Sequence, residues 1–176
     1  MLYVVDEVSG VTELGKIMYV ACLFSSTIRL YNTDSQSPLN VINVDGTNNP
    51  RDIVVCRDDR QLYIAESRCM WRVSVDDQSY VKWLTTDESF HWPTLSLTSR
   101  RLLVTSWPTP GLHQYNTTNR QLTRVVSTPQ YMSELHHGVE TTRGTFVFGH
   151  QGTPQDVCQY AVSELFSFVS YQHVTQ

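Results

Sequence analysis

The sequence predicts an all-β fold made of repeated antiparallel sheets, and three observations carry this prediction. Short runs in which bulky apolar residues alternate with small or polar ones, rich in Val, Ile, Tyr and Trp, recur along the 176 residues. Such period-2 alternation is typical of half-buried strands. Gly, Pro, Asn and Asp interrupt the chain about every 8–12 residues, which is the turn spacing of all-β domains. No window of helical length carries apolar residues at i, i+3, i+4 and i+7 without a breaker.

A repeat of about 42 residues organises these runs. One series of strands, at intervals of 44, 40 and 43 residues, comprises Met18–Cys22, Leu62–Glu66, Leu102–Ser106 and Thr145–Gly149. A second series, at intervals of 43, 41 and 45 residues, begins at Ile28, Trp71, Leu112 and Val157. Four strands in each such period are typical of β-propeller blades. We therefore expect one β-propeller domain over residues 1–176, with four-stranded antiparallel blades at about 8–44, 50–84, 91–126 and 133–170.

The individual blades differ in how clearly their strands stand out. The stretch Ile53–Asp77 supplies the first three strands of the best-preserved blade, and Tyr80–Leu84 supplies the fourth. Trp71 and Trp83 alternate with valines there, so we expect both in the core between blades. The inner strand of the first blade, around Val8–Leu14, is the least distinct. In the last blade, Tyr160–Ser170 has some helical spacing, but its place in the repeat favours a turn and an outer strand.

The number of blades raises the question of ring closure. Four blades are the lower end of the usual range of about 4–8. An interface between blades that buries about five apolar side chains contributes roughly 7–15 kcal/mol before entropy is subtracted. An open arc would leave one such face exposed to water at each end, together with unpaired strand edges. A strand-like run at Leu2–Glu7 also precedes the first blade. We therefore expect an incomplete or truncated propeller, with a compact four-bladed ring as the alternative.

Charge and composition exclude several classes of partner. The 13 basic and 17 acidic residues give a net charge of −4, and neither sign is clustered, which disfavours nucleic acid. No apolar run approaches the roughly 20 residues that span a bilayer, and no signal peptide is evident, which favours a cytoplasmic location without membrane contact. The cysteines form no C-x-x-C pair, so we expect buried free thiols rather than zinc ligands. They are Cys22, Cys56, Cys69 and Cys158.

The loops that enter each blade, and those between its second and third strands, should lie on one face of the propeller. This loop face is our candidate binding surface, since charged, histidine and tryptophan residues gather there. The candidates are Glu66, Arg68, His91, Trp92, Trp107, His136 and His150. Ordinary surface charges and structural histidines are the alternative explanation. Trp92 and Trp107, each followed by Pro, could anchor a protein interface, in which Trp is enriched.

No catalytic or metal residue, and no cofactor, is predicted. Nucleophile elbows, phosphate-binding Gly loops, H-E-x-x-H and EF-hand patterns do not occur. His136 and His137 are adjacent, so a strand points them to opposite faces and they do not chelate one metal together.

The blade containing Pro50–Cys56, Leu62–Glu66 and Met70–Ser74 resembles the NHL-type propeller repeat, in which a proline and an inner strand precede the second and third strands. His91–Leu95 repeats the proline entry, and the resemblance covers about residues 16–170. The acidic residue usual after the second strand is present only at Glu66. The other repeats carry Leu23, Ser106 and His150 at this position.

The resemblance implies a non-catalytic interaction module that binds a protein partner. Two alternatives remain open. Gluconolactonase-like propellers hold a metal in a central channel with carboxylates and Asn, and here a site would need His91, His150 or Glu66 from neighbouring blades. RNA binding, known in some NHL propellers, would need a basic face, which the acidic balance disfavours.

Overall fold

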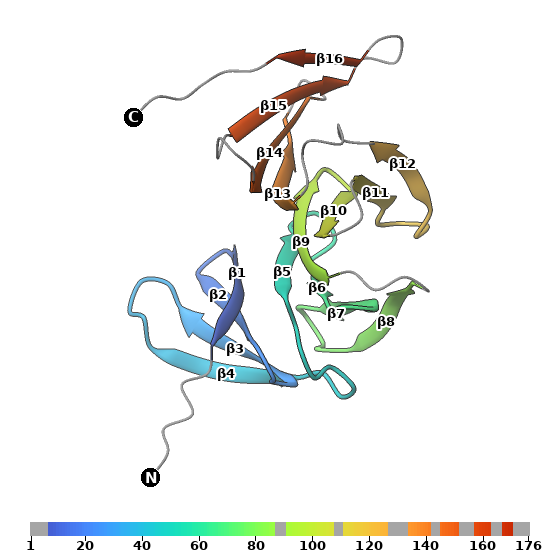
Figure 1. Ribbon diagram of the computed structural model, residues 1–176. Coiled ribbons are helices and arrows are strands. Elements are labelled where there is room, and N and C mark those ends of the chain that lie inside the picture. Colours follow the sequence, from blue (N-terminus) through green and yellow to red (C-terminus); the bar gives the residue numbers. More distant parts are fainter. Residues whose placement is uncertain are drawn as a thin grey trace. The chain divides into compact units, whose positions relative to one another are not determined.

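The computed structural model describes residues 7–86, 91–107, 111–126, 134–141, 145–151, 157–162 and 167–170. These residues form sixteen strands in four antiparallel sheets of four strands each, and they contain no helix (Figure 1). The chain separates into two compact units, residues 1–89 (unit 1) and residues 90–176 (unit 2). Each unit contains two of the sheets.

In both units every sheet is a simple meander, in which strands that follow one another in the sequence are neighbours in the sheet. The first sheet of unit 1 consists of β1 (Val8–Leu14), β2 (Ile17–Cys22), β3 (Thr27–Asn32) and β4 (Pro38–Asn43). Its second sheet consists of β5 (Asp52–Cys56), β6 (Gln61–Ala65), β7 (Cys69–Ser74) and β8 (Tyr80–Thr85). The first sheet of unit 2 consists of β9 (His91–Thr98), β10 (Arg101–Trp107), β11 (Leu112–Asn116) and β12 (Leu122–Val126). Its second sheet consists of β13 (Glu134–Glu140), β14 (Phe146–Gln151), β15 (Val157–Val162) and β16 (Ser167–Ser170).

This architecture confirms the all-β prediction and the four-stranded antiparallel repeat. The indistinct run Val8–Leu14 is a strand, with a register shift between Val8 and Gly10 in its pairing with β2. The segment Tyr160–Ser170, which has partial helical spacing, contributes to β15 and forms β16. The repeat therefore predicted its secondary structure correctly. The strand-like run at the N-terminus lies almost wholly outside the described residues, which begin at Glu7.

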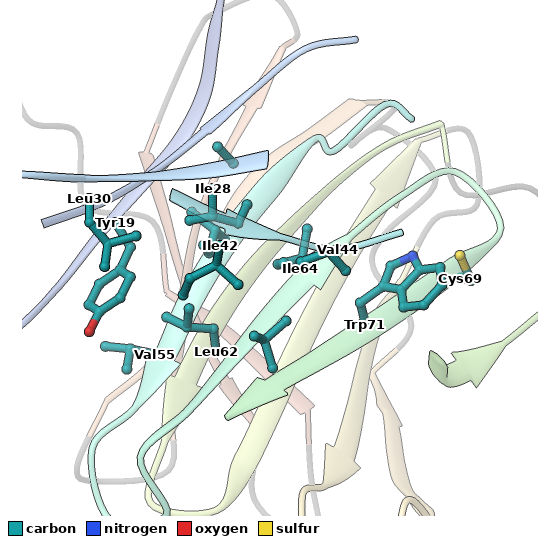
Figure 2. Packing of buried hydrophobic residues seen from close by; sticks show 13 residues of the cluster. Tyr19, Ile28, Leu30, Ile42, Val44, Val55, Leu62, Ile64, Cys69 and Trp71 are labelled. Carbon is teal, nitrogen blue, oxygen red and sulfur yellow. The ribbon is translucent and has the colours of Figure 1, made fainter. Parts of the chain in front are cut away.

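The two sheets of unit 1 pack face to face through an apolar core. Inward-facing residues of β2, β3 and β4 meet those of β5, β6 and β7 (Figure 2). Its members include Tyr19, Ile28, Ile42, Val55, Leu62, Ile64 and Trp71. Trp71 is part of this core, as the alternation predicted. Trp83 is also buried, but it lies outside this cluster, with its ring 5.1 Å from that of Tyr63. At Gly10 a side chain would not fit, because a Cβ atom there would lie 2.8 Å from the backbone nitrogen of Ile53.

Within unit 2, strand β13 lies against β9 and β10. Gly138 makes this approach possible, since a Cβ atom there would lie 3.0 Å from Cγ2 of Thr105. A polar contact crosses the same junction: Gln114 Nε2 donates a hydrogen bond of 2.8 Å to Oε2 of the buried Glu140. A Cβ atom at position 138 would also lie 3.2 Å from Cδ2 of Leu112, so this junction combines apolar and polar contacts.

Cys22, Cys56 and Cys69 are buried thiols outside any disulfide, as predicted, and the side chain of Cys158 lies outside the described residues. No helix in the described part of the chain is long and apolar enough to cross a membrane.

Candidate binding surface

Three loops of unit 1 lie at one end of its sheets, which we call the loop end. They are residues 23–26 between β2 and β3, residues 44–51 between β4 and β5, and residues 66–68 between β6 and β7. The antiparallel pairing of β5 with β6 puts the start of β5 next to the end of β6. The backbone N–H of Arg51 accordingly donates to the carbonyl of Ala65 at 2.8 Å.

The carboxylate of Glu66 is buried at the loop end, with 7% of the residue exposed. Oε1 accepts the backbone N–H groups of Asn48 at 2.8 Å and Asn49 at 3.1 Å. Oε2 accepts the indole N–H of Trp71 at 3.0 Å and the thiol of Cys69 at 3.2 Å. A carboxylate offers about four lone-pair sites, so these donors occupy its accepting capacity.

This environment keeps Glu66 ionised. Burial by itself raises the pKa of the carboxyl, but the hydrogen bonds from Asn49, Trp71, Asn48 and Cys69 together outweigh burial, and the net pKa is below its usual value. A metal ion would have to displace at least one of these donors. Glu66 therefore acts as an anchor that ties residues 44–51 to the second sheet.

Cys69 is correspondingly unreactive. Burial, followed by its hydrogen bond to the Glu66 carboxylate, raises the pKa of this thiol to about 11. Since the thiolate is the nucleophilic form, the thiol serves as a hydrogen-bond donor rather than as a nucleophile at neutral pH.

Trp71 and Tyr80 fix the rest of this loop. Gly46 has φ +96° and lies directly over the indole, where a Cβ atom would come within 3.0 Å of Cη2 of Trp71. The hydroxyl of Tyr80 donates to Oδ2 of Asp45 at 2.9 Å, and its ring meets Trp71 edge to face at 6.1 Å. The carboxylate of Glu66, the ring of Trp71 and the hydroxyl of Tyr80 thus all contact residues 44–51.

Arg68 occupies the exposed part of the same end. Its backbone carbonyl accepts the N–H of Thr86 at 3.0 Å, while the N–H of Glu66 donates to the carbonyl of Cys69 at 2.9 Å. The loop backbone is therefore fixed on both sides and presents the Arg68 side chain toward solvent. The two sequence candidates of unit 1 thus differ: Arg68 is exposed, whereas Glu66 lies beneath the surface.

In unit 2 the backbone register brings the candidate residues to one end. His91 pairs with Trp107 across β9 and β10, and His150 pairs with Leu135 across β13 and β14. At the opposite end, Thr98 Oγ1 donates to the backbone carbonyl of Glu140 at 3.2 Å, so the ends of β9 and β13 lie together. Both strands therefore begin at the end that carries the histidines.

A β-bulge interrupts each of these two pairings. Between Thr94 and His91, β9 holds one residue more than β10, which places the bulge at Trp92 and Pro93. In β13 the extra residue is His136. Bulges re-aim side chains and are common near functional sites. The side chains of His91, Trp92, Trp107, His136 and His150 lie outside the described residues.

Sequence reasoning missed one residue at the loop end of unit 1. Phe24, in residues 23–26, has a positive φ of 59° and is 79% exposed. Only its position after a buried strand, next to Leu23, could have indicated a loop. Among the described residues no group of three or more His, Cys, Asp or Glu could hold a metal ion.

The fold is similar to that of solved structures. The computationally designed Ika4 protein has a TM-score of 0.66 at 12% identity, over 90% of this chain and 93% of that chain. Hydrazine synthase of Kuenenia stuttgartiensis has a TM-score of 0.73 at 11% identity, over 97% of this chain and 51% of that chain. This chain thus spans about half the length of the hydrazine synthase chain. At such identities the likeness shows the fold alone.

No family model matches the chain, and no curated protein matches it either.

Proposed function

We propose that the chain is a segment of a β-propeller of NHL-type repeats that acts as a non-catalytic interaction module. It binds a protein partner through the loop ends of its sheets. Four four-stranded meanders at a period of about 42 residues support the propeller. The candidate residues of both units lie at the ends where the inner strands begin, which supports the choice of surface.

The observation that carries this proposal is the occupied carboxylate of Glu66. In a metal-dependent hydrolase, Glu66 would need a carboxylate oxygen that can coordinate the metal. Here both of its oxygens accept hydrogen bonds from the protein. Two of these bonds tie the backbone of Asn48 and Asn49, in the loop of residues 44–51, to Glu66. A loop surface that is fixed before a partner arrives loses less conformational entropy on binding.

Arg68 is the contact residue of unit 1 in this proposal. Arginine is enriched at protein interfaces because its planar guanidinium donates several hydrogen bonds and stacks on aromatic faces. We propose Trp92 and Trp107 as the corresponding anchors of unit 2, with His91, His136 and His150 as further contact residues of that unit. A protein partner is also favoured by the net charge of −4, which provides no basic field for RNA.

A charge reversal with a matched control tests the proposal. A partner is first identified by chemical cross-linking in the cells that make the protein, and its purified form is titrated with the full chain. We expect Arg68→Glu to weaken binding at least about 10-fold, since it turns an attractive contact into a repulsive one. Arg57→Glu, at the opposite end of the same sheet, should leave the affinity within about two-fold. Equal losses for both variants would refute the loop-end surface.

A second measurement addresses the hydrolase alternative directly. Purified protein is analysed for bound divalent metal and assayed for lactone hydrolysis. Stoichiometric metal, with activity that disappears in Glu66→Gln although the variant remains folded, would overturn the proposal.

A further inference from the structure

The exposed phenylalanine at the loop end stands out against a regular pattern of backbone conformations. Positive φ is uncommon in residues other than glycine. Five described non-glycine residues with positive φ sit in hairpins that recur from sheet to sheet, namely Gln36, Arg60, Gln78, Ser99 and Arg120. Three of them occupy the same place in the five-residue turn between the third and fourth strands. Their conformation therefore follows from the repeat.

In that turn the positive φ has a clear structural purpose. The N–H of Gln36 donates to the carbonyl of Asn32 at 2.8 Å. The N–H of Gln78 donates to that of Ser74 at 3.1 Å, and the N–H of Arg120 to that of Asn116 at 2.9 Å. The left-handed residue thus closes the same turn in three sheets. In the hairpin between the first and second strands, Gly15, with φ +64°, and Ser99 come first in two-residue turns, whereas Arg60 comes last in a four-residue turn.

Phe24 is the described non-glycine residue with positive φ that this pattern does not explain. It lies between β2 and β3, and the corresponding loop of the next sheet, residues 66–68, contains no residue with positive φ. A bulky side chain in the left-handed region is strained, and strain of this kind gathers at functional positions. The meander itself therefore does not require this conformation.

The ring of Phe24 is presented to solvent by a loop that is fixed on both sides. Before it, the N–H of Leu23 donates to the carbonyl of Glu7 at 2.8 Å. After it, the hydroxyls of Ser25 and Thr27 are hydrogen-bonded at 2.9 Å, and the N–H of Thr27 donates to Ser25 Oγ at 3.2 Å. At 79% exposure, Phe24 is the most exposed of the large apolar residues described.

We propose that Phe24 is an anchor that inserts into an apolar pocket of the partner protein. The proposal rests on the loop-end function above and adds the residue that enters the partner. An aromatic ring buries a large apolar area at a small cost in side-chain entropy, which makes it an effective anchor. Glu7, whose backbone carbonyl accepts the N–H of Leu23, is an exposed acidic residue next to this loop, so we expect basic residues at the rim of the matching pocket.

Charge favours a protein over the other surfaces that an exposed ring could enter. Insertion into an anionic membrane or stacking on a nucleic-acid base relies on surrounding Lys and Arg. Here the net charge is −4, and the exposed residue whose backbone carbonyl accepts the N–H of Leu23 is the acidic Glu7. A protein pocket needs no such basic surroundings.

Substitution by glycine separates an interface role from a structural one. Glycine adopts positive φ without strain, so Phe24→Gly should leave the melting temperature unchanged or raise it by about 1–3 °C. Binding of the purified partner should fall about 30-fold, the loss typical of an interface hot spot. Leu122→Ala, which truncates a half-exposed apolar residue of β12, is the control and should keep wild-type affinity. A clear fall in melting temperature for Phe24→Gly would show that the ring packs within the protein and would overturn the proposal.

A photo-cross-linker locates the contact independently. p-Benzoylphenylalanine replaces Phe24 in one sample and Asn40, on the exposed strand β4, in another. We expect the partner to be cross-linked from position 24 and not from position 40. Absence of a protein cross-link at position 24, or retention of the chain on neutral or anionic vesicles through Phe24, overturns the proposal. If Arg68→Glu weakens binding and Phe24→Gly does not, the anchor fails while the proposed function stands; if neither variant weakens it, both fail.

Discussion

The junctions between sheets in the two units differ in how they combine apolar and polar contacts. In unit 1 an apolar core joins the sheets, and the buried carboxylate of Glu66 is surrounded by donors at the loop end. In unit 2 the buried acid, Glu140, accepts from Gln114 at 2.8 Å and lies 3.4 Å from the half-exposed guanidinium of Arg101. The hydrogen-bond donors around a buried acid thus set its role in each unit.

The largest effect is expected at Glu66. Glu66→Ala leaves four donors without their acceptor, two of them backbone N–H groups that hold residues 44–51. Each buried donor left unsatisfied costs about 1–3 kcal/mol, so we expect a loss of about 4 kcal/mol in the free energy of unfolding, partly relieved by water. Urea denaturation measures it, with Glu13→Ala on the exposed part of β1 as the control. A loss below about 1 kcal/mol would show that the carboxylate is not an anchor.

A second comparison concerns the glycines at the two junctions. A Cβ at Gly10 would meet backbone of Asp52 and Ile53 at 2.8–3.0 Å, whereas a Cβ at Gly138 would first meet the side chain of Thr105 at 3.0 Å. Side chains move more easily than strand backbone. Gly10→Ala should therefore cost about 2–3 kcal/mol and Gly138→Ala about 1 kcal/mol, within the range for overpacking. The reverse order in thermal or urea unfolding would contradict this account.

At Glu140 the expected effect is smaller. Glu140→Gln keeps the side-chain shape and one acceptor for Gln114, and it removes an ion pair whose arginine is half exposed. We expect a loss of about 1 kcal/mol in the free energy of unfolding, because solvent screens such pairs. Salt titration checks the cause: raising the ionic strength should reduce the difference between wild type and variant. A difference that does not depend on salt would point to packing instead.

Low pH should destabilise unit 1 by protonating Glu66. The folded pKa of this carboxyl lies below its ordinary value, so the unfolded chain binds the proton more readily than the folded one. The stabilisation is therefore complete above the unfolded pKa of about 4.3 and is lost as the pH falls through the folded pKa. We expect the stability advantage of wild type over Glu66→Gln to decrease below about pH 4. An advantage that stays constant between pH 6 and about pH 3 would contradict the assigned pKa direction.

Much of the fold follows from local pattern. Alternation placed the strands, and the repeat placed even the indistinct inner strand at Val8–Leu14 and rejected a helix near Tyr160. The turns followed because their sequences repeat the same backbone requirements, as at Gln36 and Gln78. These features depend on residues within one repeat, which is why one sequence is enough to predict them.

The candidate site was predicted less completely, because burial depends on residues that are distant in sequence. Glu66 was expected on an exposed loop together with Arg68. It is buried because the N–H groups that it accepts come from Asn48 and Asn49, in the loop that precedes the blade. The sequence did not predict the exposed ring and positive φ of Phe24. Both depend on the hydrogen bonds that fix the loop at Glu7 and Thr27.

By itself the sequence determined an all-β chain of four antiparallel meanders, since period-2 alternation and turn chemistry act over a few residues. The tertiary structure alone decided which charged residue is an anchor and which one faces solvent. Glu66 and Arg68 are two positions apart, yet one accepts four hydrogen bonds in the interior and the other remains exposed. The physical reason is that a buried charge persists only where donors from other elements converge on it, and that convergence exists only after the sheets have packed.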